Sequence, residues 1–284
     1  MGTDSGLVVV DKAGGMTSHD VVARVRRLAG TRKVGHAGTL DPMATGVLVL
    51  GVHRATRLLG HLMLTEKAYD ATVRLGVSTS TDDAEGEVVA TAPTDRLDEA
   101  EVRRVLAGFV GEIDQVPTAV SAIKVDGRRA YQRVRAGEPV ELEPRRVTIH
   151  ELTVREVAGA DVRISVRCSS GTYIRAIARD AGAALGVGGH LTALRRTAVG
   201  QFAIDAARTL DELEQGFAVL PIAEAARRSF PAVDLGAPEA ADVRFGRALG
   251  RELPGLSALF APDGEFLALY EPRDGVARAV AVFV

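Results

Sequence analysis

One short stretch of the sequence gathers residues that could do chemistry. Residues 33–46 read KVGHAGTLDPMATG and place one histidine, His36, and one carboxylate, Asp41, among three glycines. Glycine allows backbone shapes that are closed to other residues, and Pro42 fixes its own φ while it pushes Asp41 towards an extended shape. We therefore expect a stiff loop that presents the Asp41 carboxylate at a set angle, and a carboxylate held in this way can serve as a nucleophile.

Other interpretations of this stretch have to be weighed. Asp-Pro is a common turn pair, and a glycine-rich loop before a strand is often only a connection. A phosphate-binding P-loop is not favoured, because no Gly-Lys-Ser/Thr ends the loop and the apolar run of residues 47–50 predicts a strand where a helix would be needed. Spacing alone leaves the structural and the chemical interpretation open.

The composition is typical of a globular protein. The 284 residues suffice for one large domain and a small one, and 46% of them are apolar. The longest apolar runs fall far short of the roughly 18 residues of a membrane span, and no basic-then-apolar signal stands at the N-terminus. The single cysteine, Cys168, follows the apolar phase of its segment and cannot form an internal disulfide, which favours a core position and a reducing compartment. We expect a cytoplasmic protein.

Positive charge is concentrated in two regions, although the formal net charge is only −2. Residues 1–60 hold eight Lys/Arg against four Asp, and residues 124–146 hold seven Lys/Arg against four acids. Such regions suit a phosphate-bearing partner, but a solvated charged face is an equal alternative. For residues 124–146 the two interpretations are RNA contact and an exposed surface helix around residues 128–135.

The elements that must position the loop follow from hydrophobic periodicity. Strands are predicted at residues 6–10, 47–52, 66–76, 87–91, 146–154 and 162–168, and helices at about residues 18–30, 97–109 and 175–185. Ser18 is a plausible N-cap of the first helix. The polar turn of residues 79–86 carries three acids but lacks the regular oxygen spacing of a Ca²⁺ loop, and the histidines lack zinc-ligand spacing. No metal is expected.

Residues 35–46, GHAGTLDPMATG, closely resemble the signature of the bacterial tRNA pseudouridine synthase B family, which converts a uridine in the T loop of tRNA, position 55, into pseudouridine. Residues 169–175 and 186–196 match two further motifs in the same order. The resemblance implies an α+β pseudouridine synthase domain over residues 1–228, built around a mixed, mostly antiparallel central sheet flanked by helices. It also implies a basic RNA-contacting insertion at about residues 124–146 and a small C-terminal β-rich, PUA-like domain over residues 229–284.

The resemblance further assigns roles to single residues. Asp41 is the expected nucleophile, and Arg175 is expected to hold it ionised. Tyr69 is expected to lie against the target uracil and to take part in proton transfer, and His36 to occupy the place that the flipped base leaves. The remaining expected substrate-binding residues are Lys12, Tyr173 and Leu194. Whether Asp41 attacks C1′ of the sugar or C6 of the base stays open.

Pseudouridine formation breaks the N1–C1′ bond and joins C5 to C1′, so its atoms balance and no cofactor is expected. The target uridine must leave its stack, at a cost of a few kcal/mol. We expect an enzyme that binds tRNA as a monomer and needs neither a membrane nor a protein partner. The rival hypotheses are a tRNA-binding or refolding module in which catalysis is incidental, and a guide-RNA-dependent relative that acts within a larger complex.

Overall fold

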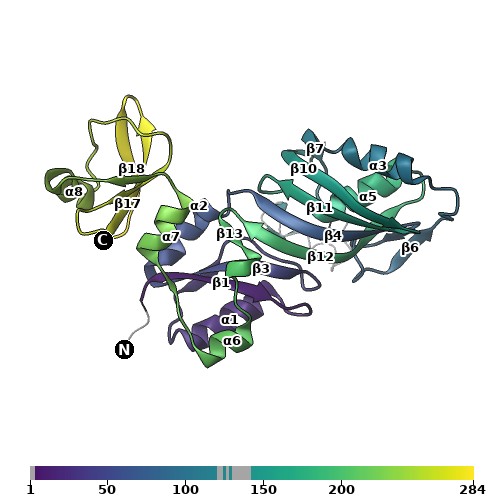
Figure 1. Ribbon diagram of the computed structural model, residues 1–284, viewed down its shortest axis with the longest axis horizontal. Coiled ribbons are helices and arrows are strands. Elements are labelled where there is room, and N and C mark those ends of the chain that lie inside the picture. Colours follow the sequence, from purple (N-terminus) through teal and green to yellow (C-terminus); the bar gives the residue numbers. More distant parts are fainter. Residues whose placement is uncertain (1–3, 120–123, 126–127, 130–141) are drawn as a thin grey trace.

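A twisted sheet forms the spine of the molecule, with helices packed along it and a second, smaller sheet at one end (Figure 1). This computed structural model describes residues 4–119, 124–125, 128–129 and 142–284. None of the helices in those ranges is long and apolar enough to cross a membrane.

Within the described residues, ten strands form the large sheet in the order β14-β1-β3-β12-β4-β11-β10-β7, with β2 added to β3 and β13 added to β12. In this order the strands are Leu220–Pro221, Gly6–Lys12, Thr45–Val52, Gly189–Val199, Lys67–Leu75, Asp161–Cys168, Arg145–Ala158 and Gly111–Gln115, followed by Val34–His36 (β2) and Phe202–Ala203 (β13). Neighbouring strands are antiparallel except β12 and β3, which pair in parallel at Arg196 and Gly46. The expected mixed, mostly antiparallel sheet is confirmed.

Among the described residues, four helices pack on one face of this sheet. They are α1 (Ser18–Leu28), α3 (Glu99–Ala107), α5 (Ile174–Ala184) and α6 (Leu210–Gln215). Each turns an apolar stripe towards the strands, so that Val21 and Val25 of α1 share one buried cluster with Leu48 and Leu50 of β3. Burial of an aliphatic side chain of this size stabilises the fold by about 1.5–3 kcal/mol. The cluster therefore fixes the sheet from which the site residues project.

The start of α1 differs by one residue from the prediction. Thr17 is the N-cap, and its hydroxyl accepts from the backbone N–H of Asp20 while the Asp20 carboxylate accepts from the N–H of Thr17. This reciprocal pair is a capping box, and it leaves Ser18 as the first helical residue. The Ser18 side chain is therefore available for a contact outside the helix.

The smaller sheet has the order β15-β16-β17-β18. Its strands are Ala232–Asp234, Ser257–Phe260, Phe266–Arg273 and Val276–Val282. Helix α8 (Ala237–Arg244) packs against this sheet. The sequence analysis predicted only β structure in this region and did not predict this helix. Gly236 precedes that helix and Pro238 lies in its first turn, a position that proline tolerates well.

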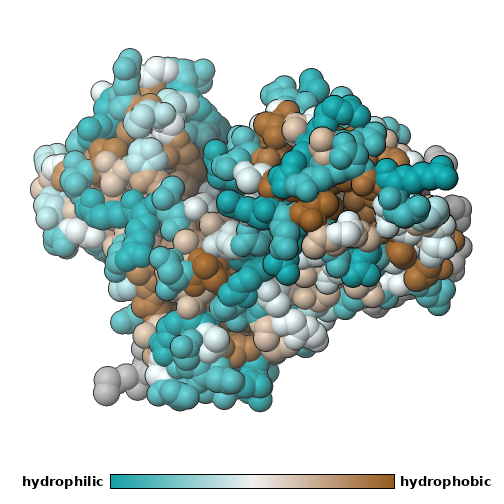
Figure 2. Space-filling view, turned by 45° about the vertical axis from the view of Figure 1, so that its right-hand side comes forward, coloured by the Kyte–Doolittle hydropathy of each residue, from teal (hydrophilic) through white to brown (hydrophobic). Residues whose placement is uncertain are grey.

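The two sheets share a core. A second buried cluster joins Val47 and Val49 of β3 with Phe260, Phe266 and Phe283 of the C-terminal region. Between them lie η1 (His53–Leu58), α2 (Leu59–Leu62) and α7 (Ile222–Ser229), while η2 (Ile204–Ala206) follows β13. In the space-filling view the C-terminal part stands as a lobe, separated from the large sheet by a notch at the top (Figure 2).

The predicted basic insertion at about residues 124–146 ends earlier than expected, because its last two residues lie in the large sheet. Arg145 and Arg146 belong to β10, where they pair with Gln115 and Asp114 of β7. Arg146 also lies 3.6 Å from the Asp114 carboxylate, a cross-strand charge pair that favours this pairing. Lys124–Val125 (β8) pairs with Arg128–Arg129 (β9) as a short hairpin. The alternative of a surface helix is therefore wrong at residues 128–129, and residues 130–135 lie outside the described part of the chain.

Candidate active site

A cavity of about 300 Å³ opens where four segments of the large sheet region meet. The loop before β3, strand β4, the start of α5 and strand β12 each contribute side chains to it. Among the lining residues are Asp41, Tyr69, Tyr173, Arg175 and Leu194. Five of the seven residues singled out from the sequence thus share one cavity.

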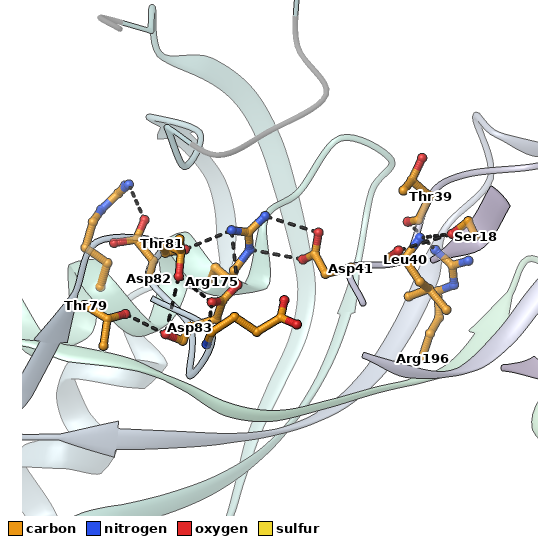
Figure 3. A network of polar contacts seen from close by, with 12 residues as sticks. Ser18, Thr39, Leu40, Asp41, Thr79, Thr81, Asp82, Asp83, Arg175 and Arg196 are labelled. Carbon is orange, nitrogen blue, oxygen red and sulfur yellow. Dashed lines mark hydrogen bonds and ion pairs between the residues drawn. The ribbon is translucent and has the colours of Figure 1, made fainter. Parts of the chain in front are cut away.

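Asp41 and Arg175 face each other as a two-pronged ion pair (Figure 3). The Nε of Arg175 lies 3.1 Å from Oδ2 of Asp41, and its Nη2 donates to Oδ1 at 3.3 Å. The Arg175 side chain is only 5% exposed, whereas the Asp41 side chain is 34% exposed. A bidentate guanidinium fixes both the orientation and the charge of a carboxylate, so Asp41 is held towards the cavity while one side stays open to a substrate.

A second carboxylate, which the sequence did not reveal, shares the same guanidinium. Nη1 of Arg175 lies 3.3 Å from Oδ2 of Asp83 and donates to the carbonyl oxygen of Thr81 at 2.8 Å. Asp83 is buried in the turn between β5 (Val77–Thr79) and β6 (Val88–Thr91), where Oδ1 also accepts from the Glu85 N–H. Arg175 is therefore anchored from behind by Asp83 and Thr81 while its front holds Asp41.

The charge balance of this cluster affects the pKa of Asp41. Burial raises the pKa of the Asp41 carboxyl above its ordinary value; the Arg175 guanidinium opposes this, and the nearby Asp83 carboxylate adds to it. Lys12 and Arg196 also lower the Asp41 pKa, by smaller amounts. The negative charge on Asp41 is thus less favourable than on a free aspartate, as is usual for a buried acid.

This balance predicts the pH dependence of the reaction. If the ionised Asp41 carboxylate is required, the single-turnover rate should fall as the pH is lowered, with an apparent pKa above 3.8. Asp83→Asn removes a negative charge that raises the Asp41 pKa, so the acid limb should move to lower pH. The measurement is the pH profile of both proteins, with Asp263→Asn, an exposed turn residue, as the matched control. An acid limb that stays in place in Asp83→Asn would contradict the assignment.

The loop that carries Asp41 is held from both sides by buried side chains. The Ser18 hydroxyl donates to the carbonyl oxygen of Leu40 at 3.1 Å and accepts from its N–H at 2.9 Å. Arg196, which is fully buried, donates to the carbonyl oxygens of Gly38 and Thr39. These contacts explain how an irregular backbone keeps one conformation (Figure 3).

We expect Ser18→Ala to loosen this loop. The substitution leaves the buried N–H of Leu40 without its partner, at a cost of about 1–3 kcal/mol of unfolding free energy. Because Leu40 directly precedes Asp41, the single-turnover rate should fall as well. Urea unfolding and rapid-quench kinetics measure the two effects. A normal rate in a destabilised protein would mean that Arg196 and Lys12 hold the loop in place without Ser18.

Lys12 does not line the cavity, contrary to its expected place among the substrate-binding residues. Its side chain is fully buried, and Nζ donates to the carbonyl oxygens of Ala13, Met16 and Pro42 at 2.9, 2.7 and 3.2 Å. With all three N–H groups used, the ammonium clamps the backbone just after Asp41. Lys12 is therefore a positioning residue of the loop.

Gly46 marks the end of the same loop, where β3 meets β12. Its φ is +99°, and a Cβ on this residue would lie 2.2 Å from the carbonyl oxygen of Arg196. Only glycine permits this close parallel approach of the two strands. It brings the buried guanidinium of Arg196 under the loop.

Tyr69 and Tyr173 approach the cavity from different elements. Tyr69 is half-buried on β4, and burial raises the pKa of its phenol, an effect that the Arg196 guanidinium opposes. The backbone of Tyr173 is bound at both its N–H and its carbonyl oxygen by the side chain of Gln115, at 2.8 and 3.1 Å. Gln115 is buried at the end of β7. It therefore fixes the start of α5, two residues before Arg175.

His36 lies on β2, outside the residues that line the cavity. Its ring meets that of His19 edge to face, with the centroids 5.8 Å apart. Its Nδ1 is buried and has no hydrogen-bond partner among the described residues. Burial, together with His19, lowers the pKa of His36. The imidazole is thus biased towards its neutral form.

Comparison with known proteins decides the family. Residues 26–174 match the model for the N-terminal domain of the TruB family pseudouridylate synthases. Residues 175–226 match the model for the tRNA pseudouridylate synthase B C-terminal domain, and residues 230–284 match that for the tRNA pseudouridine synthase II C-terminal domain. The chain belongs to the TruB family. A curated relative from Thermobifida fusca (strain YX) is 60% identical over 98% of both chains, and one from Nocardia farcinica is 59% identical over 98% of this chain and 92% of its own. Both are named tRNA pseudouridine synthase B.

Solved structures agree with the TruB assignment. A structure described as a Cbf5-Nop10-Gar1 complex matches 98% of this chain and 85% of its own, with 28% identity and a TM-score of 0.76. An H/ACA RNP bound to a substrate RNA containing 2'-deoxyuridine matches with 27% identity and a TM-score of 0.73, over 98% and 85% of the two chains. The expected pseudouridine synthase fold is confirmed. As a TruB protein, the chain is an isomerase that converts uridine to pseudouridine in tRNA.

The functional residues that sequence reasoning missed in this TruB chain are Asp83, Gln115 and Arg196, together with the loop contact of Ser18. The sequence contained one signal for Ser18. Thr17 and Asp20 are spaced as in a capping box, which makes Thr17 the N-cap and leaves the Ser18 hydroxyl free to bond outside the helix. No such local signal marked Asp83 or Gln115. Their partners lie far along the chain and become neighbours only in the folded protein.

Proposed function

We propose that this chain isomerises uridine 55 in the T loop of tRNA, with Asp41 as the nucleophile. The observation that carries the proposal is the Asp41 carboxylate, which Arg175 holds by two contacts at the edge of a 300 Å³ cavity. A cavity of this size has room for a flipped-out base. The names of the curated relatives support tRNA as the substrate.

The proposed reaction uses groups of this chain alone. Asp41 forms a bond to C1′ or to C6, the N1–C1′ bond breaks, the uracil turns within the cavity, and C5 joins C1′. The bond to Asp41 then breaks, either as C5 displaces it from C1′ or by its release from C6, so that the free carboxylate is restored. One proton leaves C5 and one is gained at N1, so the overall change is an isomerisation. Arg175 keeps the attacking oxygen ionised, and Leu194 and Tyr173 line the space in which the base turns. His36 enters the place that the base vacates, and its neutral ring suits stacking.

Tyr69 is proposed to contact the uracil and to assist the proton transfer. The phenol is protonated at neutral pH and burial raises its pKa further, so it can act as a hydrogen-bond donor. Tyr69→Phe should therefore lower the single-turnover rate much more than the affinity for tRNA, by about 10²-fold or more. Rapid-quench assays and filter binding on the same preparations measure the two quantities. Equal turnover by the two proteins would contradict this role.

The wider organisation is also part of the proposal. Residues 1–228 act as the catalytic domain, the basic insertion at about residues 124–146 contacts RNA, and residues 229–284 form a PUA-like domain. The chain works in the cytoplasm, where its tRNA substrate is, as a monomer without a protein partner.

The test is to incubate the pure chain with unmodified tRNA, without added cofactor, and to map pseudouridine at nucleotide resolution. Pseudouridine at position 55 alone supports the proposal. Product that forms only when a guide RNA or a protein partner is added would favour a guide-dependent enzyme. tRNA refolding without product would favour the refolding module.

A further inference from the structure

A buried cation, Lys67, is part of the lining of the Asp41 cavity. It is the first residue of β4, only 7% exposed, and it precedes Tyr69 by two positions on the same face of the strand. Its Nζ donates to the backbone carbonyl oxygens of Met63 and Thr65. Since an ammonium has three N–H donors, one of them has no protein acceptor among the described residues. That donor is left for a molecule in the cavity.

The positive charge of Lys67 is not balanced by a carboxylate in the described part of the chain. The adjacent Glu66 carboxylate has partners of its own, since it lies 2.9 Å from Arg167 and 3.2 Å from His150. A buried charge without a partner is costly. A cation retained in the lining of a substrate cavity therefore points to a ligand that brings the opposite charge.

The protonation of Lys67 follows from its surroundings. Burial is the largest effect and, with the nearby Arg196 guanidinium, lowers the pKa of Lys67 to about 8. The Cys168 thiol opposes this, but its own pKa is raised to about 11, so it is uncharged at neutral pH. At pH 7 Lys67 is thus still mainly an ammonium.

Lys12 provides a comparison within the same protein. It is also buried, but its Nζ gives all three N–H groups to backbone carbonyl oxygens, and it does not line the cavity. Lys67 gives two and lines the cavity. Holding the backbone accounts for every donor of Lys12 but leaves one donor of Lys67 for another role.

The uracil acquires negative charge during the isomerisation. If Asp41 attacks C1′, the electron pair of the N1–C1′ bond passes to the ring, and O2 and O4 share the charge. If Asp41 attacks C6, the addition places the charge on O4 as an enolate. Both routes therefore put an anion in the cavity for part of the reaction. A fixed cation in a site that excludes water stabilises such a charge far more than it would in bulk water.

We propose that the Lys67 ammonium donates a hydrogen bond to a carbonyl oxygen of the uracil and stabilises the negative charge that the ring carries during the reaction. The inference rests on the proposed function, which places the uracil in this cavity. Lys67 keeps its proton throughout, so the balance of the isomerisation is unchanged: C5 loses one proton and N1 gains one. Lys67 is then a catalytic residue, whereas Lys12 is a positioning residue.

The test compares Lys67→Gln with the wild type in single-turnover assays on unmodified tRNA. The amide can still donate to the carbonyl oxygens of Met63 and Thr65 but carries no charge, so the protein should stay folded in urea unfolding experiments. The rate should fall by about 10²–10³-fold, as when a donor to a developing oxyanion is removed, while the affinity for tRNA should not change. Lys67→Arg keeps a cation and should retain more of the rate. The matched control is Arg96→Gln, which removes one exposed charge before α3.

The pH profile separates this role from a structural one. Below saturation the wild-type rate reports the free enzyme, and it should fall as the pH rises through about 8 and Lys67 loses its proton. The pKa of Tyr69 is raised above 10, so its phenol cannot cause this fall. Lys67→Gln and Lys67→Arg should both lack it. A lysine that only held Met63 and Thr65 would show no such fall, because the neutral amine retains two N–H donors.

Two outcomes would overturn the proposal. One is a normal rate in folded Lys67→Gln. The other is weaker tRNA binding with a slope of log affinity against log salt that is lower by about 0.9, which would assign the ammonium to a phosphate of the RNA. Pseudouridine at a position other than 55 would overturn the proposed function instead, and a rate at that position that depends on Lys67 would leave the present inference standing.

Discussion

Asp41→Asn is expected to abolish pseudouridine formation while the protein stays folded and still binds tRNA. The amide is nearly the same size as the carboxylate but cannot form the covalent bond to the nucleoside, so the single-turnover rate should fall by about 10⁴-fold or more. The contacts that hold the loop come from Ser18, Arg196 and Lys12, and none of them involves the Asp41 side chain. Binding and catalysis should therefore separate in this variant.

The stability of the same variant provides its control. Because the pKa of Asp41 is raised in the folded protein, the ionised carboxylate lowers the stability of the fold, and this cost appears as the pH rises through the folded-state pKa. At neutral pH, Asp41→Asn should thus melt at the same temperature as the wild type or higher. Normal product yield from Asp41→Asn would remove the basis of the proposed mechanism, and loss of tRNA binding would assign Asp41 to recognition instead.

Arg175→Met is expected to have the second large effect, because one guanidinium serves two carboxylates. Its removal leaves Asp41 and Asp83 without the cation that they share and takes a donor from the carbonyl oxygen of Thr81. Loss of one partner of a buried ion pair costs about 3–5 kcal/mol of unfolding free energy. The single-turnover rate should fall strongly as well, since Asp41 then titrates at higher pH and loses its fixed orientation.

A double variant separates the two functions of Arg175. In Arg175→Met/Asp83→Asn the second negative charge is gone, so part of the lost stability should return. The rate should stay low, because Asp41 still lacks its bidentate partner. Urea unfolding and single-turnover kinetics of the four proteins of the cycle give both coupling energies. No recovery of stability would mean that Asp83 is held mainly by its contacts within the turn.

Strand β4, the fold and the family could be predicted from the sequence because each depends on local sequence patterns. Alternation of apolar residues from Tyr69 to Leu75 predicts a strand with one buried face, and β4 has that face. The three motifs, in order, predicted the fold and family. The TruB family match and the similar solved structures confirm both.

What could not be predicted depends on long-range contacts. A lysine is almost never fully buried, so nothing in the sequence indicated that three backbone carbonyls would surround Lys12. The acids of the polar turn at residues 79–86 were weighed only as a Ca²⁺ site, yet one of them, Asp83, reaches the guanidinium of Arg175. Helix α8 was missed because its residues show little amphipathic pattern, and its packing against the small sheet decides its conformation.

The cluster that joins Val47 and Val49 to Phe260, Phe266 and Phe283 has a consequence for biosynthesis. On the ribosome, early segments of a chain generally fold first. Here, earlier residues such as Leu58, Leu62 and Phe202 cover part of the underside of β3, but the cluster is complete only when residue 283 has left the exit tunnel. The nascent enzyme therefore keeps part of the apolar floor beneath its reactive loop exposed to water until the end of translation.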